Sequence, residues 1–313
     1  MTEPIRVAIV GMGRIAHEHH LPAIAVNKAF DLVATVSPEG GSTNGLPVFQ
    51  DIDALTTSNL PVDAVIVCTP PQVRRAIAAR ALTRGWHVFL EKPPAPSLAE
   101  SEFLRELSLD CGVTLFASWH SRYAAGVARA RKWLAERTIK HVTIIWREDV
   151  RVWHPGQEWM WRAGGLGVFD AGINALSIAT IIMPRPIFVV DAELDFPANL
   201  AAPIAARLSL MDTQGVPIAV DLDFRQEGPQ SWDIKIETDI GRMTLRNGGA
   251  DLILPGAAST GAAADLHGEY QALYTRFAEL IRAGRSYMDV APLRLVADSF
   301  LCGRQSLVTP FIE

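Results

Sequence analysis

The chain has 313 residues, of which 49% are hydrophobic and 20% are charged, and its formal net charge is -5. This length and apolar content predict a globular protein with a substantial core, divided into two domains. The acidic balance and the lack of Lys/Arg runs argue against a nucleic-acid-binding surface. No apolar run reaches the roughly 20 residues that a membrane-crossing helix needs. No signal-like segment opens the sequence, so we expect a cytoplasmic protein without nucleic-acid or membrane partners.

A glycine-rich turn follows the first apolar segment. In IRVAIVGMGRIA a strand-like run leads into Gly11, Gly13 and Ala16 at the G-x-G-x-x-A spacing, and a helix is predicted to about residue 26. Gly11 allows a tight turn, Gly13 lets the backbone approach a pyrophosphate, and Ala16 keeps the helix close to the strand. The helix N–H groups then point at the phosphates. The sequence predicts a dinucleotide site whose contacts in this loop are Gly11, Met12, Gly13, Arg14 and Ile15.

Apolar strands alternate with helical stretches through the rest of the first 120 residues. Strands are predicted at 31–36, 47–49, 63–68, 87–91 and 113–118, and helices at 72–83 and 97–110. This alternation is typical of a parallel, doubly wound sheet of the Rossmann type, which binds its ligand beyond the carboxyl ends of its strands. We expect residues 1–120 to form this α/β domain.

The end of the second strand contacts the adenosine ribose in such folds. A carboxylate there accepts from the 2'-hydroxyl of NAD, whereas an Arg binds the 2'-phosphate of NADP. Here Ser37 and Pro38 supply neither group, and Glu39 lies two residues late. We predict Ser37 as a cofactor contact and favour NAD, with NADP left open because a Ser hydroxyl can also donate to a phosphate.

The cysteines and the clustered histidines are the remaining features with possible metal or redox chemistry. Cys68, Cys111 and Cys302 are few, odd in number and far apart, which favours reduced thiols over disulfides. The run HEHH at 17–20 resembles a metal-binding cluster, but it falls early in a predicted helix and lacks the other ligands that a site needs. We expect no metal.

The segment GGLGVFDAGIN, residues 164–174, places Asp170 and Asn174 four positions apart. At 3.6 residues per turn they share one face of a helix, and its glycine-rich start would allow another group to approach closely. A carboxylate beside an amide suggests a proton acceptor next to a neutral hydrogen-bonding group. Alternatively, Asp170 only stabilises the first turn of that helix.

From about residue 187 the pattern changes to near-alternation between turn signals. Apolar and polar residues alternate in the segments 187–196, 202–212, 216–226, 231–239 and 241–249. This pattern is typical of an antiparallel meander with one covered face. We predict a mobile surface loop at 258–265 and closing helices at 268–283 and 291–307. Residues 121–313 would form a second, α+β domain for substrate binding and oligomerisation, with the C-terminal helix as a candidate to pack back on the first domain.

Four motifs together resemble the Gfo/Idh/MocA (glucose-fructose oxidoreductase/inositol dehydrogenase) family. They are the glycine loop, CTPPQV, ALTRGWHVFLEKP and GGLGVFDAGIN, with EKP at 91–93 the most specific. The likeness spans essentially the whole chain. It implies a Rossmann domain followed by an open-faced, mainly antiparallel sheet, with a sugar between the domains and a homodimer or homotetramer formed through that sheet. It also implies cofactor contacts from Thr69, Pro70, Glu91 and Lys92.

Finer details resemble one branch of that family, the bacterial aldose 1-dehydrogenases that act on D-galactose and L-arabinose. These details are LFASWHSR at 115–122, EDVRVWHPGQEWMW at 148–161, and Asn174. The resemblance implies oxidation of a pyranose at C1 to the aldonolactone with NAD or NADP. We predict Asp170 as the base, Asn174 as a hydrogen-bond donor to the sugar oxygen, and Lys92 as the group that stabilises oxyanion charge or, if desolvated, acts as base itself.

Two positions depart from the commoner family pattern. The family motif TPxxxH would place His at position 74, where this chain has Arg74, and D-x-G-x-H would place His at position 174. An amide cannot take a proton, so the usual imidazole base is missing and its role passes to another group. The aldose 1-dehydrogenase branch resembles this chain in having Asn there, which makes the change a mark of that branch.

Aromatic residues and histidines supply the predicted sugar contacts. Aromatic faces suit the C–H faces of a pyranose, and imidazole or carboxylate groups bind its hydroxyls. The predicted contacts are His120, Glu148, Trp153, His154 and Trp232. The alternative for Trp146, Trp153, Trp159 and Trp161 is a place in the core between the two domains, which we expect for at least two of them.

Two rival functions stay open from the sequence. One is a regulator that binds nucleotide and sugar without turnover, against which Asp170 and Lys92 argue. The other is a polyol or inositol dehydrogenase of the same family, against which the missing His at position 174 and the Trp-rich segment argue.

Overall fold

The computed structural model describes residues 3–40 and 45–312, and the chain divides into two compact units. The first unit combines Met1–His120 with Leu266–Val290, and the second combines Ser121–Asp265 with Ala291–Glu313. The sequence analysis also divided the chain after residue 120. The segment that returns to the first unit is 266–290, whereas the C-terminal helix, for which this return was expected, lies in the second unit.

A six-stranded parallel sheet forms the centre of the first unit, in the order β3-β2-β1-β4-β5-β6. This is the predicted Rossmann arrangement, and β1 and β4 are neighbours at the point where the strand order reverses. The strands are β1 (Ile5–Val10), β2 (Phe30–Val36), β3 (Val48–Phe49), β4 (Ala64–Val67), β5 (His87–Glu91) and β6 (Leu115–Ser118).

Helices cover both faces of this sheet. They are α1 (Leu21–Val26), α2 (Ile52–Thr57), α3 (Pro71–Thr83), α4 (Leu98–Asp110) and α8 (Leu266–Arg282). Because side chains alternate along a strand, Val88 and Leu90 of β5 join the apolar cluster that contains Leu82 and Leu104, whereas Phe89 points the other way. A π-helical turn, Ala16–His20, precedes α1, so the helix after the glycine loop is regular only from residue 21.

Aromatic packing explains why α8 belongs to the first unit. Tyr274 and Phe277 of α8 are fully buried, and both pack against Phe89 with ring centroids 5.4 and 5.5 Å apart. Phe277 also stacks on Phe30 and Phe116. Burying such rings stabilises the unit by about 1.5–3 kcal/mol each. The parallel sheet therefore obtains part of its cover from a segment distant in the sequence.

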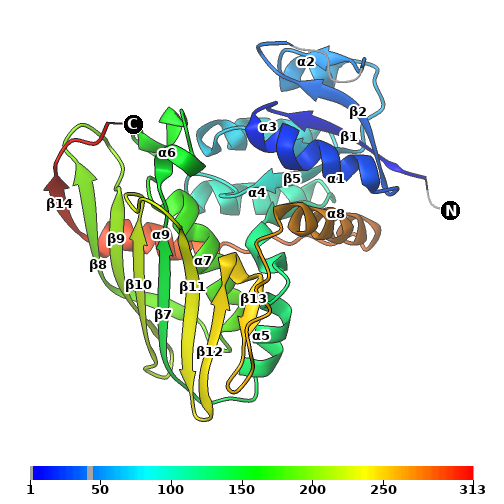
Figure 1. Cartoon of the computed structure of the whole chain (residues 1–313). Coiled ribbons are helices and arrows are strands. Elements are labelled where there is room, and N and C mark those ends of the chain that lie inside the picture. The colour runs from blue at the N-terminus through cyan, green and yellow to red at the C-terminus, as the bar shows by residue number, and fades with distance from the viewer. Residues whose placement is uncertain (1–2, 41–44, 313) are drawn as a thin grey trace. The chain divides into compact units, whose positions relative to one another are not determined.

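An eight-stranded mixed sheet forms the second unit, in the order β13-β12-β11-β7-β10-β9-β8-β14. Its strands are β7 (Ile139–Arg147), β8 (Ile187–Pro197), β9 (Ala205–Asp212), β10 (Pro217–Asp223), β11 (Ser231–Thr238), β12 (Gly241–Arg246), β13 (Asp251–Ile253) and β14 (Arg304–Val308). Figure 1 shows α5 (Val127–Leu134), α7 (Phe169–Ile182) and α9 (Ala291–Cys302) along one face of this sheet.

The predicted simple meander is wrong in two places. The strand β7 lies between β10 and β11, parallel to β10 and antiparallel to β11, so those two sequence neighbours do not pair. The predicted helix 291–307 ends at Cys302, and β14 then pairs in parallel with β8. At Gly303 an added Cβ would lie 2.4 Å from the carbonyl oxygen of Ser299, so a glycine is needed where the chain leaves the helix.

The segment predicted as a mobile loop, 258–265, is tied to the second unit. The carboxylate of Asp251 is fully buried and accepts from the hydroxyls of Ser259 at 2.6 Å and Thr260 at 2.8 Å. These bonds, with the Arg246 guanidinium, lower the pKa of Asp251 to about 2 despite the opposing effect of burial. No helix in the described part of the chain is long and apolar enough to cross a membrane.

Candidate active site

The glycine loop of the first unit has room for a dinucleotide phosphate. Gly11 has φ +92°, and an added Cβ would lie 2.9 Å from the side chain and backbone nitrogen of Thr69. By contrast, a Cβ at Gly13 would meet nothing within 4 Å, so this side of the loop is open. The hydroxyl of Thr69 is buried and finds no hydrogen-bond partner among residues 3–40 and 45–312. An open loop beside an unsatisfied polar atom fits a bound nucleotide.

The other predicted cofactor residues lie at the same carboxyl-terminal edge of the sheet. Ser37 is buried at the end of β2, and Glu39 is exposed two residues later. Met12 and Ile15 are half-buried, whereas Arg14 is exposed and pairs with Glu18 at 2.9 Å. Thr69 and Pro70 follow β4, and Glu91 ends β5. The structure places these groups together, while their contact with a cofactor stays a prediction.

Glu91 sits in a buried hydrogen-bond network directly before Lys92. Its carboxylate is 3% exposed; Oε1 accepts from Tyr270 at 2.9 Å and lies 3.0 Å from His20 Nε2, and Oε2 accepts from the Lys92 backbone at 3.0 Å. Burial raises the pKa of Glu91, but the hydrogen bond from His20 and the charges of His20, His120 and Arg74 outweigh it and lower the pKa to about 2. The anion therefore fixes the backbone of the half-buried Lys92.

Arg74 secures the same loop from another direction. Its guanidinium is 4% exposed, and its Nε donates to the Thr69 carbonyl at 2.7 Å. Its NH1 donates to the carbonyls of Glu91 and Pro93, which flank Lys92. Arg74 thus joins the loop after β4 to the loop after β5, and both loops belong to the predicted site.

The HEHH run is part of this packing. His20 Nδ1 lies 2.8 Å from the Tyr274 hydroxyl, and the His19 ring stacks on Tyr270 with centroids 5.0 Å apart. Burial lowers the pKa of His19 and so favours its neutral form. His120, predicted as a sugar contact, is 7% exposed, and its Nδ1 lies 2.7 Å from Glu269 Oε2. Within the described residues, no three His, Cys, Asp or Glu side chains are grouped as a metal site would require.

In the second unit, α7 carries Asp170 and Asn174 one turn apart, as predicted. Asp170 is 3% exposed, and Asn174 is half-buried. The glycines before this helix make room for backbone, which differs from the expected approach of a ligand: a Cβ at Gly165 would lie 2.2 Å from the Met160 carbonyl oxygen, and one at Gly167 would lie 2.2 Å from that of Pro203. They allow the start of α7 to pack tightly, which holds Asp170 in place.

Three predicted sugar contacts meet in one hydrogen-bonded cluster of the second unit. Glu148, 2% exposed, follows β7; its Oε2 accepts from Trp232 Nε1 at 2.7 Å, and its Oε1 lies 2.8 Å from His154 Nε2. The other nitrogen of His154, Nδ1, lies 3.9 Å from Asp170 Oδ2. Both oxygens of Glu148 are therefore engaged within the protein, which gives it a positioning role. Its predicted contact with a sugar stays a prediction.

The tryptophans of the second unit divide between buried and accessible positions. Trp146 and Trp161 are buried, at 5% and 7% exposure, whereas Trp153 is 38% exposed. Trp232 stacks on Trp146 and meets Trp153 edge to face, with ring centroids 4.7 Å apart in the second pair. Trp153 thus offers an accessible aromatic surface beside the Glu148–His154 cluster, as sugar binding needs.

Comparisons with known proteins agree with this fold. Residues 5–118 match the profile of the oxidoreductase family with an NAD-binding Rossmann fold, Gfo/Idh/MocA. The chain is 43% identical over 314 residues to galactose 1-dehydrogenase of Pseudomonas fluorescens, covering 99% of this chain and 100% of that protein. The chain belongs to the Gfo/Idh/MocA family.

Solved structures of the Gfo/Idh/MocA fold extend the likeness to both units. The crystal structure of a D-galactose-1-dehydrogenase from Rhizobium etli is 50% identical with a TM-score of 0.93, covering 100% of this chain and 99% of that one. A 3-ketoreductase from Actinomadura kijaniata, in complex with NADP, is 19% identical with a TM-score of 0.84 over 97% and 99%, and so shares the fold. The protein is an oxidoreductase enzyme with an NAD-binding fold.

The two departures from the commoner Gfo/Idh/MocA pattern now have structural accounts. Arg74 reaches three backbone carbonyls, and an imidazole has too few N–H groups to do the same. Where the family pattern places an imidazole at position 174, this chain brings His154 to Asp170 from another segment. Sequence reasoning missed Glu269, Tyr270 and Tyr274 because they come from α8. The sequence offered only one clue to them, which is the spacing of its large aromatic residues.

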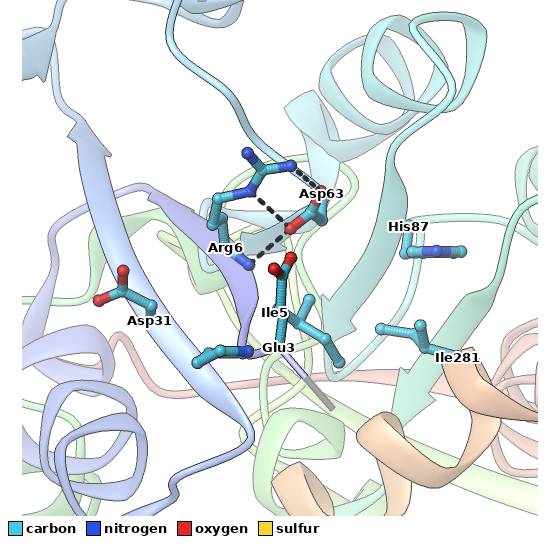
Figure 2. Close-up of a pocket in the computed structure, with 8 residues that line it drawn as sticks. Glu3, Ile5, Arg6, Asp31, Asp63, His87 and Ile281 are labelled. Atoms are coloured by element: carbon cyan, nitrogen blue, oxygen red, sulfur yellow. Dashed lines mark hydrogen bonds and ion pairs between the residues drawn. The ribbon is translucent and has the colours of Figure 1, made fainter. Parts of the chain in front are cut away.

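A separate hollow lies at the opposite, amino-terminal ends of the first unit's strands. It has a volume of about 560 Å³ and is lined by Glu3, Pro4, Ile5, Arg6, Asp31, Asp63, His87 and Ile281. Figure 2 shows Arg6 and Asp63 facing each other, and their side chains form a bidentate ion pair at 2.6 and 2.9 Å. Because Rossmann folds bind ligands at the carboxyl ends, this ion pair is a structural clamp between β1 and β4.

Proposed function

We propose that this enzyme oxidises D-galactose, L-arabinose or both at C1, with NAD or NADP, to the aldonolactone. The observation that carries the proposal is a buried carboxylate, Asp170, one helical turn before the amide of Asn174, with His154 Nδ1 3.9 Å from its Oδ2. The full-length likeness to two galactose 1-dehydrogenases supports the substrate class. The two sugars differ only in the substituent at C5, so one pocket can accept both.

Oxidation of a hemiacetal requires loss of a proton from the C1 hydroxyl together with loss of hydride from C1. When bound, the nicotinamide accepts that hydride. Asp170 takes the proton, and Asn174 donates a hydrogen bond to the sugar oxygen. Lys92, with its backbone held by Glu91 and Arg74, stabilises the negative charge that develops on that oxygen.

NAD is the proposed cofactor, with NADP as the alternative. The family profile is that of an NAD-binding fold, and Glu39 is the acidic group nearest in sequence to the end of β2. Ser37 is buried there and has no positive charge with which to select a 2'-phosphate. Comparing kcat/KM for NAD and NADP tests this preference directly, and a larger value with NADP refutes it.

The decisive assay follows reduced cofactor by absorbance with a panel of aldoses and cyclitols. Turnover of galactose or arabinose, with the lactone as first product, supports the proposal, whereas exclusive turnover of a cyclitol refutes it. Asp170→Asn preserves the size of the side chain and removes the base. It should reduce kcat by about 100-fold or more, the usual contribution of a general base, while cofactor binding stays nearly unchanged. Retained activity in this variant would show that Asp170 is not the base and would favour Lys92 in that role.

A regulator that binds sugar without turnover is the alternative from another functional class. Its signature would be saturable sugar binding by calorimetry with no reduction of cofactor in any condition of the panel. The presence of both Asp170 and Lys92 favours the enzyme, because ligand binding alone does not require a buried base.

We also propose a cytoplasmic homodimer or homotetramer that forms through the open face of the second unit's sheet. This face carries Arg–carboxylate pairs such as Arg147–Asp221 and Arg207–Glu193, together with Val190, which is 52% exposed. Analytical ultracentrifugation of the wild type and of Val190→Asp tests the interface. A wild type that sediments as a monomer refutes it, and cell fractionation tests the location.

A further inference from the structure

Four polar groups from four segments of the second unit lie in a line with two hydrogen bonds and one longer approach. Trp232 Nε1 donates to Glu148 Oε2 at 2.7 Å, and Glu148 Oε1 lies 2.8 Å from His154 Nε2. His154 Nδ1 then lies 3.9 Å from Asp170 Oδ2. Glu148 and Asp170 are 2% and 3% exposed, whereas the His154 side chain is 17% exposed. The partly exposed imidazole therefore lies between two buried carboxylates.

The donors and acceptors in this line fix the tautomer of His154. An ionised carboxylate only accepts hydrogen bonds, and Trp232 already donates to one oxygen of Glu148. The bond between Glu148 and His154 therefore needs a hydrogen on His154 Nε2. In the neutral imidazole this leaves the lone pair on Nδ1, the atom that faces Asp170. His154 is thus oriented to accept a proton from the direction of Asp170.

We propose that His154, oriented by Glu148, takes the catalytic proton from Asp170 and passes it to solvent. The inference rests on the proposed function, because this proton comes from the C1 hydroxyl of the aldose. As the C1–H electron pair leaves as hydride to NAD(P)+, the O–H bond breaks and its proton moves to Asp170. The proton then moves from the Asp170 carboxyl to His154 Nδ1, which restores the base, and leaves the imidazolium through Nδ1.

Carboxylates face both nitrogens of the His154 ring. After the transfer, the imidazolium of His154 has an anionic carboxylate at each nitrogen, Glu148 at Nε2 and Asp170 at Nδ1. The adjoining segments carry two further charged pairs, Asp149 with Arg151 and Asp223 with Arg225, each at 2.9 Å. Each of these cations is balanced by its own carboxylate, so the two carboxylates that face the ring dominate its surroundings.

This transfer of the proton from Asp170 through His154 to solvent, called the relay below, also accounts for the amide at position 174. In the commoner family pattern an imidazole lies at that position on the same helix as the aspartate, whereas here His154 approaches Asp170 from the end of α6 (Val150–Trp153). Glu148 and His154 act through Asp170 and are positioning residues. If His154 only binds sugar hydroxyls, its substitution removes a binding contact, which raises KM and leaves kcat unchanged. The relay instead predicts a fall in kcat.

The kinetic test compares His154→Gln, His154→Ala, Glu148→Gln and a matched control, His141→Gln. His141 is a half-buried imidazole on β7 whose Nε2 lies 3.1 Å from the Thr143 hydroxyl, and it is not part of the line. The relay predicts that kcat falls about tenfold or more in the His154 and Glu148 variants, a fraction of the effect of a general base. It also predicts that the acidic limb of the kcat profile shifts in His154→Gln, that added imidazole restores activity to His154→Ala, and that the control is unchanged.

A second measurement needs no turnover. Nitrogen-15 NMR of the free protein at high pH should show neutral His154 protonated on Nε2, and Glu148→Gln should weaken this preference, because an amide can donate to Nε2. A neutral ring protonated on Nδ1 in the wild type overturns the relay. The kinetic results separate failure of the relay from failure of the proposed function. If the wild type oxidises no aldose, the proposed function and the relay are both wrong. If it does, but His154→Gln changes KM alone and keeps kcat and its pH profile, only the relay is wrong.

Discussion

Glu91 offers a quantitative test of how the first unit holds Lys92. Its pKa of about 2, against 4.5 for an ordinary Glu, means that folding favours the anion over the protonated form. At 1.36 kcal/mol per factor of ten, this difference contributes about 3 kcal/mol to the free energy of unfolding at neutral pH. The contribution is complete above pH 4.5 and is lost as the pH falls towards 2, because the native carboxylate then takes up a proton.

The assay is urea unfolding of the wild type and Glu91→Gln, followed by circular dichroism from pH 7 to pH 3. The amide has no charge to lose, so the stability difference between the two proteins should be about 3 kcal/mol at pH 7 and less than half of that near pH 3. Glu102→Gln, at an exposed position of α4 in the same unit, is the control and should show no such trend. A difference for Glu91→Gln that stays constant across this range would refute the reasoning.

Two further predictions concern the cofactor loops. Arg74→His leaves at least one of the three carbonyls without its donor, and a hydrogen bond from a charged group contributes about 1.5–3 kcal/mol. We therefore expect kcat/KM to fall tenfold or more. An unchanged kcat/KM would contradict the role of Arg74 in joining the loops after β4 and β5. Gly13→Ala meets no protein atom within 4 Å, so its melting temperature should match the wild type while NADH binding, measured by fluorescence, weakens about tenfold. Gly11→Ala, with Thr69 at 2.9 Å, should lose both stability and binding, and equal behaviour of the two variants would contradict this account.

The first unit could be predicted well because its signals are local. The central strands β1 and β4 are buried on both faces and appear as short apolar runs, and the glycine spacing marks where β1 ends. The sequence suggested a return of the C-terminal helix but not of α8, because the large aromatic residues of α8 show only that one of its faces is buried and not which sheet covers it. The strand order of the second sheet was harder to predict for the same reason. Alternation shows that β7 and β10 are strands with one covered face, but it does not show which strands pair.

The site shows the same limit at the level of single residues. Spacing on one helix placed Asp170 beside Asn174, and a family motif pointed to Lys92. The sequence also yielded Glu148, His154 and Trp232, but only as separate sugar contacts. The hydrogen bond from Trp232 to Glu148 forms because β7 and β11 are neighbours in the sheet, with Trp146 opposite Trp232 in the register. A hydrogen bond between segments 84 residues apart has no signature in either segment.

The exchange of His for Asn at position 174 shows why a motif is best interpreted through geometry. Read along the helix alone, the change removes an imidazole and suggests a weaker site, yet the structure brings His154 to within 3.9 Å of the same carboxylate. Proton transfer depends on which atoms meet, and an imidazole can meet Asp170 from α7 or from the segment after α6. Because the second route also supplies Glu148 behind the ring, it fixes the tautomer, which an imidazole on α7 would need another partner to achieve.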